Sequence, residues 1–195
     1  CIAVQVLGEV PCDAALRRDG ARPGNDIWIS GVLGEAALGL AHLQNKIQLE
    51  RDTAAICLRR LHTPQPRIGL GRALRGIASA AIDISDGLLA DLGHIAAASG
   101  VGAELMVDQV LPERLPGVDR AIALNAALAG GDDYELCFCA LPQQRDAIGM
   151  IAQKLQLPLT RVGRIVAGCG VSAIGSDGRI LDVRRRGFDH FQPSP

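Results

Sequence analysis

The sequence predicts a single α/β domain in which helices pack on a sheet. Its 195 residues are enough for one domain of ordinary size. Apolar residues make up 48% of the chain and aromatic residues only 3%, so Ala, Leu, Ile and Val must fill the core, as suits helices on a sheet. Strand and helix patterns also intermingle along the chain, without a repeat of fixed length or a low-complexity linker.

The chain begins on a strand pattern. Residues 1–8 read Cys-Ile-Ala-Val-Gln-Val-Leu-Gly, which alternates and is rich in β-branched side chains, with no Met, helix cap or loop before it. A chain that opens in mid-strand is more often a piece of a longer chain than a complete product. We therefore expect an N-terminal portion to be missing and residues 1–10 to be the strand that links to it; the alternative is a strand at a true terminus.

Glycine and proline divide the first half of the chain into short elements. A helical turn is expected at residues 14–18, followed by a Gly/Pro loop at 20–24. The alternation of Asp-Ile-Trp-Ile-Ser predicts a strand at 26–30. Apolar residues at helical spacing and the stiff break His-Thr-Pro-Gln-Pro then predict three helices, at 34–43, 49–61 and 67–74.

The clearest helix pattern lies at residues 86–99. Leu88, Leu92 and Ile95 recur at intervals of three to four, and Gly100 supplies a left-handed stop. A short apolar run just before it predicts a buried strand at 79–84. The other expected elements are strands at 101–107, 134–140 and 160–166, helices at 119–129 and 143–155, and a hairpin of 171–174 with 179–183 around a turn at 176–178.

The charge pattern argues against a nucleic-acid or membrane-surface protein. Twenty basic and 21 acidic residues give a net charge of −1, and no basic run is longer than the three arginines at 184–186. The sequence contains no apolar stretch of 18 residues and no secretory signal pattern. We therefore expect a cytoplasmic protein that binds neither nucleic acid nor membranes.

The six cysteines predict structural thiols rather than a disulfide framework or a zinc site. None forms Cys-x-x-Cys, and none lies at metal-binding spacing from a histidine. Cys137 and Cys139 alternate along a predicted strand, so both should face one side as small buried hydrophobic residues. This cysteine usage favours a reducing compartment.

The first candidate site is Asp83-Ile84-Ser85-Asp86-Gly87-Leu88, where a buried strand gives way to a strong helix. Asp83 and Asp86 could face one cleft and bind divalent cations through hard oxygen ligands. The free N–H groups of the new helix would favour phosphate, and Ser85 adds a hydroxyl. The alternative is that Ser85 or Asp86 simply caps the helix, although capping does not explain Asp83.

The second candidate is Gly130-Gly131-Asp132-Asp133-Tyr134-Glu135-Leu136, where a helix stops on paired glycines and two acids precede a strand. These acids could recognise a cationic ligand or a hydroxyl. The alternative is a tight turn with solvated carboxylates.

Two further segments could contact a ligand. The aromatics of Gly187-Phe188-Asp189-His190-Phe191 could stack on a flat heterocycle or simply pin the tail to the core. Arg18, before a Gly-rich loop, could bind a nucleotide phosphate or remain a solvated surface residue. Neither a Walker loop nor a Rossmann fingerprint is present to support nucleotide binding.

Taken together, these segments resemble thiamine-monophosphate kinase, in the order that this family has them. The resemblance covers essentially the whole chain but only the C-terminal portion of the family. Asp-Ile-Ser-Asp-Gly-Leu is shared more loosely with relatives such as aminoimidazole-ribonucleotide synthetase. The matching pieces are residues 14–21 with Pro23-Gly24, residues 27–29 with Gly31, residues 83–88 with Asp91-Leu92, residues 130–136 and residues 187–191.

The resemblance implies transfer of the ATP γ-phosphoryl group to thiamine phosphate, with several Mg²⁺ ions and a possible homodimer in the full-length protein. It implies the C-terminal domain of the aminoimidazole-ribonucleotide synthetase-like fold, a mixed sheet covered by helices, over residues 1–195. The family's N-terminal ATP- and Mg²⁺-binding domain would be absent, so this chain alone should be inactive. The resemblance assigns metal binding to Asp83 and Asp86, ATP contacts to Arg18 and Ser85, and substrate binding to Asp132 and Phe188.

Two positions depart from the family pattern. Asp132 stands where the family usually has Glu, which shortens the reach by one methylene, and Phe188 replaces Tyr, which removes a hydroxyl but keeps a stacking face. Two other functions stay open: a domain that binds a phosphorylated ligand without turnover, and a related enzyme that uses ATP on another substrate.

Overall fold

The computed structural model describes residues 2–111 and 115–181. In this part of the chain, every element predicted between residues 26 and 174 is present, with its ends within two residues of the expected positions. One short helix, α5, was not predicted. The elements are β1 (Asp26–Ser30), α1 (Glu35–Leu43), α2 (Arg51–His62), α3 (Ile68–Ala73), β2 (Ala78–Asp83), α4 (Leu88–Ser99), β3 (Gly102–Met106), α5 (Val107–Val110), α6 (Arg120–Ala129), β4 (Leu136–Ala140), the 3₁₀ turn η1 (Pro142–Gln144), α7 (Arg145–Leu155), β5 (Leu159–Val166) and β6 (Gly170–Ile174).

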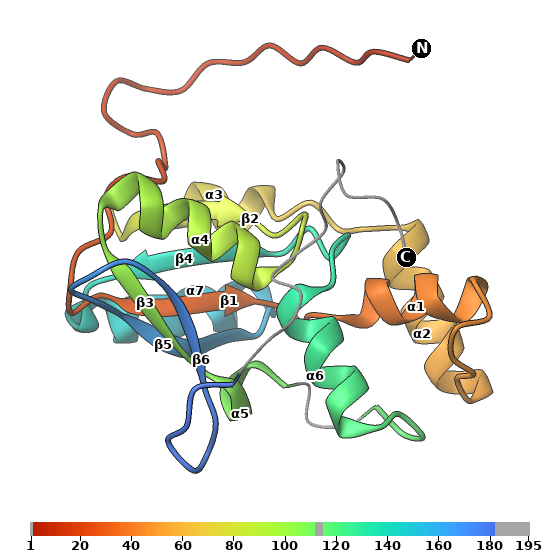
Figure 1. The fold of residues 1–195 in the computed structure, drawn as a ribbon. Coiled ribbons are helices and arrows are strands. Elements are labelled where there is room, and N and C mark those ends of the chain that lie inside the picture. The colour runs from red at the N-terminus through yellow and green to blue at the C-terminus, as the bar shows by residue number, and fades with distance from the viewer. Residues whose placement is uncertain (1, 112–114, 182–195) are drawn as a thin grey trace.

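The strands form one six-stranded mixed sheet in the order β2-β4-β1-β5-β3-β6 (Figure 1). All neighbouring pairs are antiparallel except β3 and β6, which run parallel. The register of β2 and β4 sets Asp83 opposite Leu136. The end of β2 therefore lies beside the start of β4, which brings the two acidic segments of the sequence to one place.

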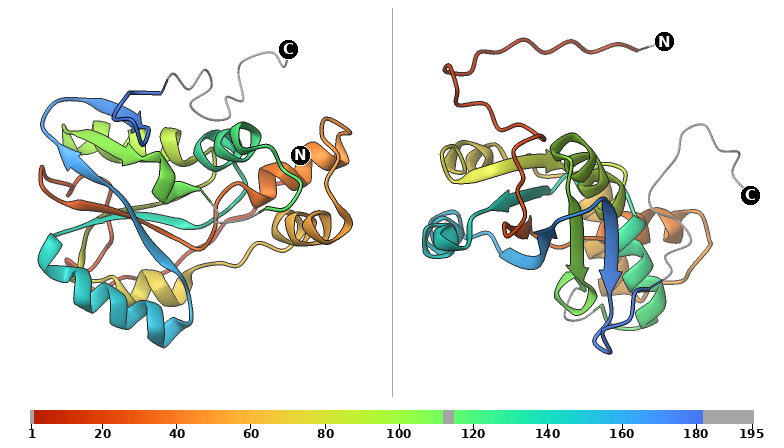
Figure 2. Two further views of the ribbon diagram at one scale, coloured as in Figure 1. Left: turned by 90° about the horizontal axis from the view of Figure 1, so that it is seen from below. Right: turned by 60° about the vertical axis from the view of Figure 1, so that its left-hand side comes forward.

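Helices cover both faces of the sheet (Figure 2). On one face α4 packs on the strands and α6 packs on α4; on the other, α3 and α7 cover the half formed by β2, β4 and β1. The alternation in β1 divides its side chains accordingly, with Ile27 and Ile29 toward α4 and Trp28 toward α7, where its ring stacks on Phe138. The fold class predicted from the sequence is confirmed.

The predicted burial of the strand cysteines is also confirmed. Cys137 and Cys139 both lie in the core on the α4 side of the sheet. Burial raises the pKa of the Cys139 thiol to about 12, so this thiol stays protonated at neutral pH. Both residues act as small core side chains.

Two predictions near the N-terminus are wrong. Residues 2–10 form no strand, and Ile2, Val4 and Val6 are exposed, because an alternating pattern forms a strand only where a neighbouring strand can pair with it. Residues 14–18 are not helical either. Instead the Ala81 N–H donates to the Arg17 carbonyl oxygen (2.8 Å), so this segment runs along the outer edge of β2.

Helices α1 and α2 pack on one another beyond one end of the sheet and adjoin α6 (Figure 1). Gly39 allows the close approach, since a Cβ there would lie 2.7 Å from the Cys57 carbonyl oxygen. Among the described residues, no helix is both long and apolar enough to span a bilayer.

Candidate active site

The two acidic segments continue the β2–β4 ladder beyond the ends of the strands. The Ile84 N–H donates to the Glu135 carbonyl oxygen (2.8 Å), and the Tyr134 N–H donates to the Ile84 carbonyl oxygen (2.9 Å). One step further, the Asp132 N–H donates to the Ser85 carbonyl oxygen (3.0 Å). Residues 83–87, here called the first loop, and residues 130–135, the second loop, therefore form one unit.

A glycine is required where the loops meet. A Cβ on Gly131 would lie only 2.4 Å from the Ser85 carbonyl oxygen, a separation that real Cβ atoms do not show. This contact explains one of the paired glycines as a close backbone approach rather than as a helix stop alone.

Three carboxylates gather around Tyr134 at this edge of the sheet. Asp83 is exposed, Asp86 and Asp132 are half-buried, and the Tyr134 hydroxyl donates to Asp132 Oδ1 (3.4 Å). Burial raises the pKa of Tyr134, and the negative charges of all three carboxylates raise it further. The structure thus brings the predicted metal ligands beside the predicted substrate-binding acid.

The second loop has an unusual backbone. Asp132 has φ 68° and Tyr134 has φ 50°, both in the left-handed region that L-residues seldom adopt. Tyr134 was expected to begin a strand, but β4 begins at Leu136 because this conformation interrupts the extended chain. Strained backbone of this kind persists where the surrounding structure imposes it, often at functional sites.

A buried carboxylate that the sequence reading did not assign supports the first loop. Asp91, in the first turn of α4, accepts N–H bonds from Ser85, Asp86 and Gly87 through Oδ2, at 2.9, 3.1 and 3.2 Å. Burial raises its pKa, and the N–H donors oppose that shift. The sequence analysis gave Asp91 no role, although Asp91-Leu92 was among the segments that carry the family resemblance.

Two expectations for the first loop are changed by the structure. The helix was predicted to begin at residue 86, but the N–H groups of Asp86 and Gly87 precede α4 and donate to Asp91, so these two are not free for phosphate. The capping alternative is also wrong, because Gly87, with φ 119°, occupies the N-cap of α4 and no side chain caps this helix.

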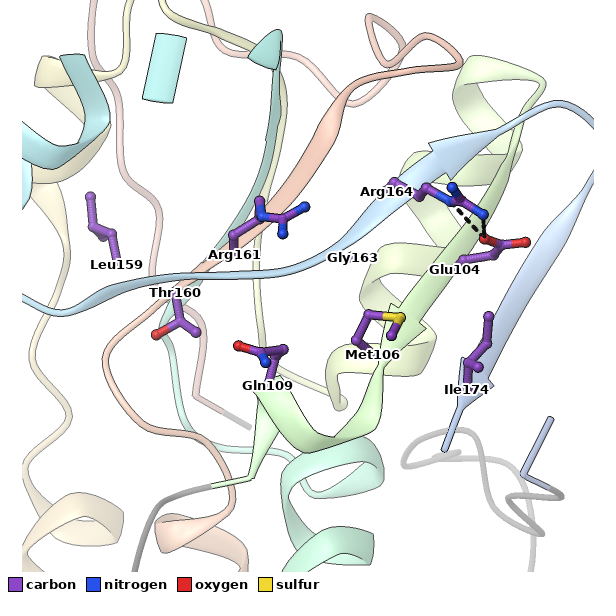
Figure 3. A pocket seen from close by; sticks show the side chains of 9 residues that line it. All are labelled: Glu104, Met106, Gln109, Leu159, Thr160, Arg161, Gly163, Arg164 and Ile174. Carbon is purple, nitrogen blue, oxygen red and sulfur yellow. Dashed lines mark hydrogen bonds and ion pairs between the residues drawn. The ribbon is translucent and has the colours of Figure 1, made fainter. Parts of the chain in front are cut away.

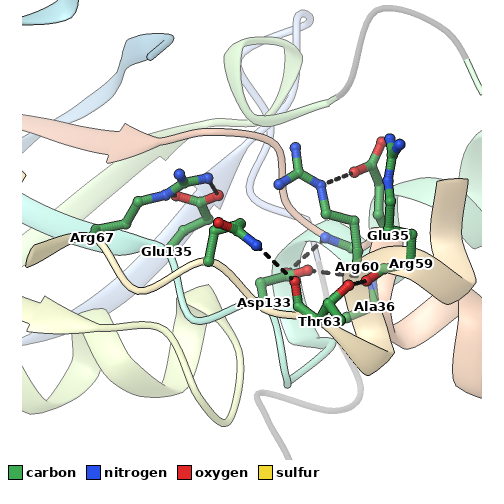
Figure 4. Close-up of polar contacts among 10 residues, drawn as sticks. Glu35, Ala36, Arg59, Arg60, Thr63, Arg67, Asp133 and Glu135 are labelled. Carbon is green, nitrogen blue, oxygen red and sulfur yellow. Dashed lines mark hydrogen bonds and ion pairs between the residues drawn. The ribbon is translucent and has the colours of Figure 1, made fainter. Parts of the chain in front are cut away.

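The other two acids of the second loop point into the protein (Figure 4). Asp133 accepts hydrogen bonds from the Gly34 N–H (2.7 Å) and the Ala36 N–H (3.4 Å), so it caps α1 rather than lying in solvent as the turn alternative expected. Burial raises the pKa of Asp133 to about 7, while the two N–H donors lower it. Nothing in the local sequence indicated which of the two neighbouring aspartates would accept the N–H groups of α1.

Glu135 forms a buried ion pair with Arg67, which the sequence reading did not single out. The Arg67 Nε donates to Glu135 Oε2 (2.6 Å), its Nη2 donates to Oε1, and the Ser30 hydroxyl donates to Oε2 (2.5 Å). Glu135 is 3% exposed and the Arg67 side chain 16%. A nearby partly buried pair, Arg60 with Glu35 (2.9 Å), ties α2 to α1 (Figure 4).

Arg18, another predicted site residue, is not brought to the two loops. The Arg18 side chain is exposed, and its carbonyl oxygen accepts from the Ser99 hydroxyl (2.9 Å) at the end of α4 remote from Ser85. At 1.5 Å per residue, the twelve-residue helix separates the two positions by about 18 Å. Phe188 lies outside the described residues.

The described residues contain no cation site made of protein ligands alone. Within residues 2–111 and 115–181, no three His, Cys, Asp or Glu side chains are disposed to bind a metal together. Mg²⁺, however, is usually held by one or two carboxylates together with substrate phosphates and water. Asp83 and Asp86 fit that pattern.

A separate cavity of about 750 Å³ lies on the half of the sheet that α3 and α7 leave uncovered (Figure 3). Its charged groups are paired already: Arg164 with Glu104 (2.8 Å), and Arg161 with the buried Asp26 (3.4 Å). The carboxylates of the two loops do not line it.

Comparison with known proteins decides the family. Residues 22–176 match the family described as AIR synthase related protein, C-terminal domain. The chain belongs to this family. It is 45% identical over 190 residues to the thiamine-monophosphate kinase of Salmonella typhimurium strain LT2, a match that covers 95% of the chain and 58% of that relative.

Solved structures agree with this assignment of the AIR synthase related domain. The thiamine-monophosphate kinase of Stenotrophomonas maltophilia is 47% identical, with a TM-score of 0.78 over 86% of this chain and 54% of that one. AaThiL complexed with AMPPCP and TMP is 31% identical, with a TM-score of 0.73 over 90% of this chain and 54% of that one. The chain thus spans a little over half the length of the relatives that it matches.

Proposed function

We propose that the protein transfers the γ-phosphoryl group of ATP to thiamine phosphate and so forms thiamine diphosphate. The observation that carries this proposal is the joining of the two acidic loops, in a chain 45% identical to a thiamine-monophosphate kinase. A relative with the same fold binds AMPPCP and TMP together, as expected of an enzyme with these two substrates.

Each predicted site residue receives a role. Asp83 and Asp86 would hold Mg²⁺, which when bound supplies positive charge to neutralise the phosphates. Asp132 would bind thiamine phosphate at the same edge, with its carboxylate oriented by Tyr134. Ser85 would contact ATP beside the metal, and Arg18, at the other end of α4, would contact a different part of the nucleotide. Phe188 would stack on the thiamine rings.

The protein would act by positioning rather than through a nucleophilic side chain. Phosphoryl transfer depends mainly on in-line placement of the two substrates and on charge neutralisation. The two described carboxylates are few for several Mg²⁺ ions, so we expect the 195-residue chain alone to be inactive. We also propose a cytoplasmic enzyme that forms a homodimer and binds neither nucleic acid nor membranes.

Radiolabelled ATP tests the proposal. The protein, expressed from its whole coding sequence, should transfer label to thiamine phosphate in a Mg²⁺-dependent manner and not to aminoimidazole precursors. Transfer only to another acceptor would establish the related-enzyme alternative. Saturable ATP binding without transfer to any acceptor would instead favour a binding domain.

A further inference from the structure

Asp91 is a buried residue whose side chain is hydrogen-bonded to the main chain of the first loop. Its side chain is 3% exposed, and its Oδ2 atom accepts three successive main-chain N–H bonds, from residues 85 to 87. Successive N–H groups that converge on one anion form a concave nest, which fixes the course of the backbone. The backbone that carries Ser85 and Asp86 is therefore wrapped around this carboxylate.

The first loop is fixed from its other sides as well. The second loop donates to the carbonyl oxygens of Ile84 and Ser85, so both the N–H and the C=O of Ser85 are bonded. Gly87 completes the turn, where a Cβ would lie about 2.9 Å from the Ala129 main chain. Of the described groups that hold the loop, the Asp91 carboxylate is the one side chain that substitution can remove without altering the loop itself.

A role in the helix alone does not account for Asp91. Acids in a first helical turn stabilise a helix by facing its N-terminal N–H groups, and they do so while exposed, as Asp146 does in α7. The three donors to Asp91 instead precede α4, and two of them belong to Ser85 and Asp86, which have proposed roles in binding.

We propose that Asp91 is a positioning residue, which holds Asp86 and Ser85 in the geometry that binds Mg²⁺ and phosphate. This inference rests on the proposed function, because it needs the first loop to bind the metal. Loss of groups that orient metal ligands usually weakens metal binding roughly 10- to 100-fold. We expect a loss of that size when Asp91 is removed.

The affinity for the metal can be measured without turnover. Electron paramagnetic resonance monitors the binding of Mn²⁺, in place of Mg²⁺, in the presence of ATP. The proteins to compare, each expressed from the whole coding sequence, are the unchanged protein, Asp91→Ala, Asp91→Asn and the control Asp146→Ala. Asp91→Ala should raise the Mn²⁺ dissociation constant at least tenfold at a temperature where it is folded. Asp91→Asn keeps an acceptor oxygen and should recover part of the affinity, and Asp146→Ala should bind as the unchanged protein does.

The outcomes separate the two proposals. If Asp91→Ala lowers the melting temperature but binds Mn²⁺ normally, the role of Asp91 is structural and the positioning proposal is wrong. If Asp91→Ala does not fold, normal Mn²⁺ affinity in Asp91→Asn, together with unchanged amide exchange at residues 85–87, overturns the proposal equally. If the unchanged protein binds no Mn²⁺, the proposed function fails first, and the role of Asp91 fails with it.

Discussion

The N–H group of Asp132 donates a hydrogen bond to the carbonyl oxygen of Ser85 over 3.0 Å, between two loops that are far apart in the sequence. The bond places the Asp132 carboxylate at the sheet edge where Asp83 and Asp86 lie. A change that separates the loops should therefore impair cation binding and substrate binding together.

Gly131→Ala is expected to separate the loops. The added Cβ would lie 2.4 Å from the Ser85 carbonyl oxygen, which belongs to the backbone and cannot rotate away. We expect a loss of about 1–3 kcal/mol in the free energy of unfolding, measured in urea, and a clear fall in phosphoryl transfer.

Gly149→Ala in α7 is the matched control, because nothing lies within 4 Å of its Cβ position. It should gain up to about 1 kcal/mol from helix propensity and keep full activity. Equal losses in the two variants would contradict the close-approach explanation.

Asp83→Asn should lower kcat far more than stability. The side chain is exposed at the end of β2 and has no hydrogen bond within the part of the chain that the structure describes, so folding should barely change. Removal of one charge-stabilising group typically costs on the order of 10²-fold in kcat. Paired kinetics and melting curves measure the two effects, and a large stability loss with turnover intact would refute the metal role.

Asp133 predicts a pH dependence of stability. Its pKa is about 7 in the folded protein against an ordinary value of 3.8, so the folded state holds this proton more tightly than the unfolded state. The stabilisation is complete below about pH 4 and is lost as pH rises toward 7, by up to ~1.4 kcal/mol per pH unit.

Asp133→Asn removes this titration, so the difference in stability between variant and unchanged protein should shift in favour of the variant as pH rises from 5 to 8. Chemical unfolding at four pH values measures the shift. A constant difference across that range would show that Asp133 does not titrate there.

Removing one partner of the Arg67–Glu135 ion pair is expected to lower the stability of the protein strongly. Glu135→Gln leaves the Arg67 guanidinium largely buried without its partner charge, which should cost about 3 kcal/mol of stability. The double variant Arg67→Met/Glu135→Gln removes the isolated charge and should recover part of that loss. Urea unfolding measures both, and equal stability of the single variant and the unchanged protein would show that the pair contributes little.

Local sequence determined the elements of this protein well. Side chains alternate between the two faces of a strand and return to one face of a helix every three to four residues. These local periods are visible in the sequence at Ile27, Trp28 and Ile29 of β1 and at Leu88, Leu92 and Ile95 of α4. The alternating pattern gave a wrong prediction at residues 2–10. A strand also needs a neighbouring strand to pair with, and the pattern of a single segment does not show whether one is present.

The site depended on tertiary structure. The sequence singled out both acidic loops, but only the antiparallel pairing of β2 with β4 places them side by side. The sequence also could not tell which acids face outward: Asp132 borders the candidate site, whereas Asp133 caps α1 and Glu135 pairs with Arg67. These neighbouring acids have different roles because distant segments supply their hydrogen-bond partners and their burial. Those segments meet only in the folded chain.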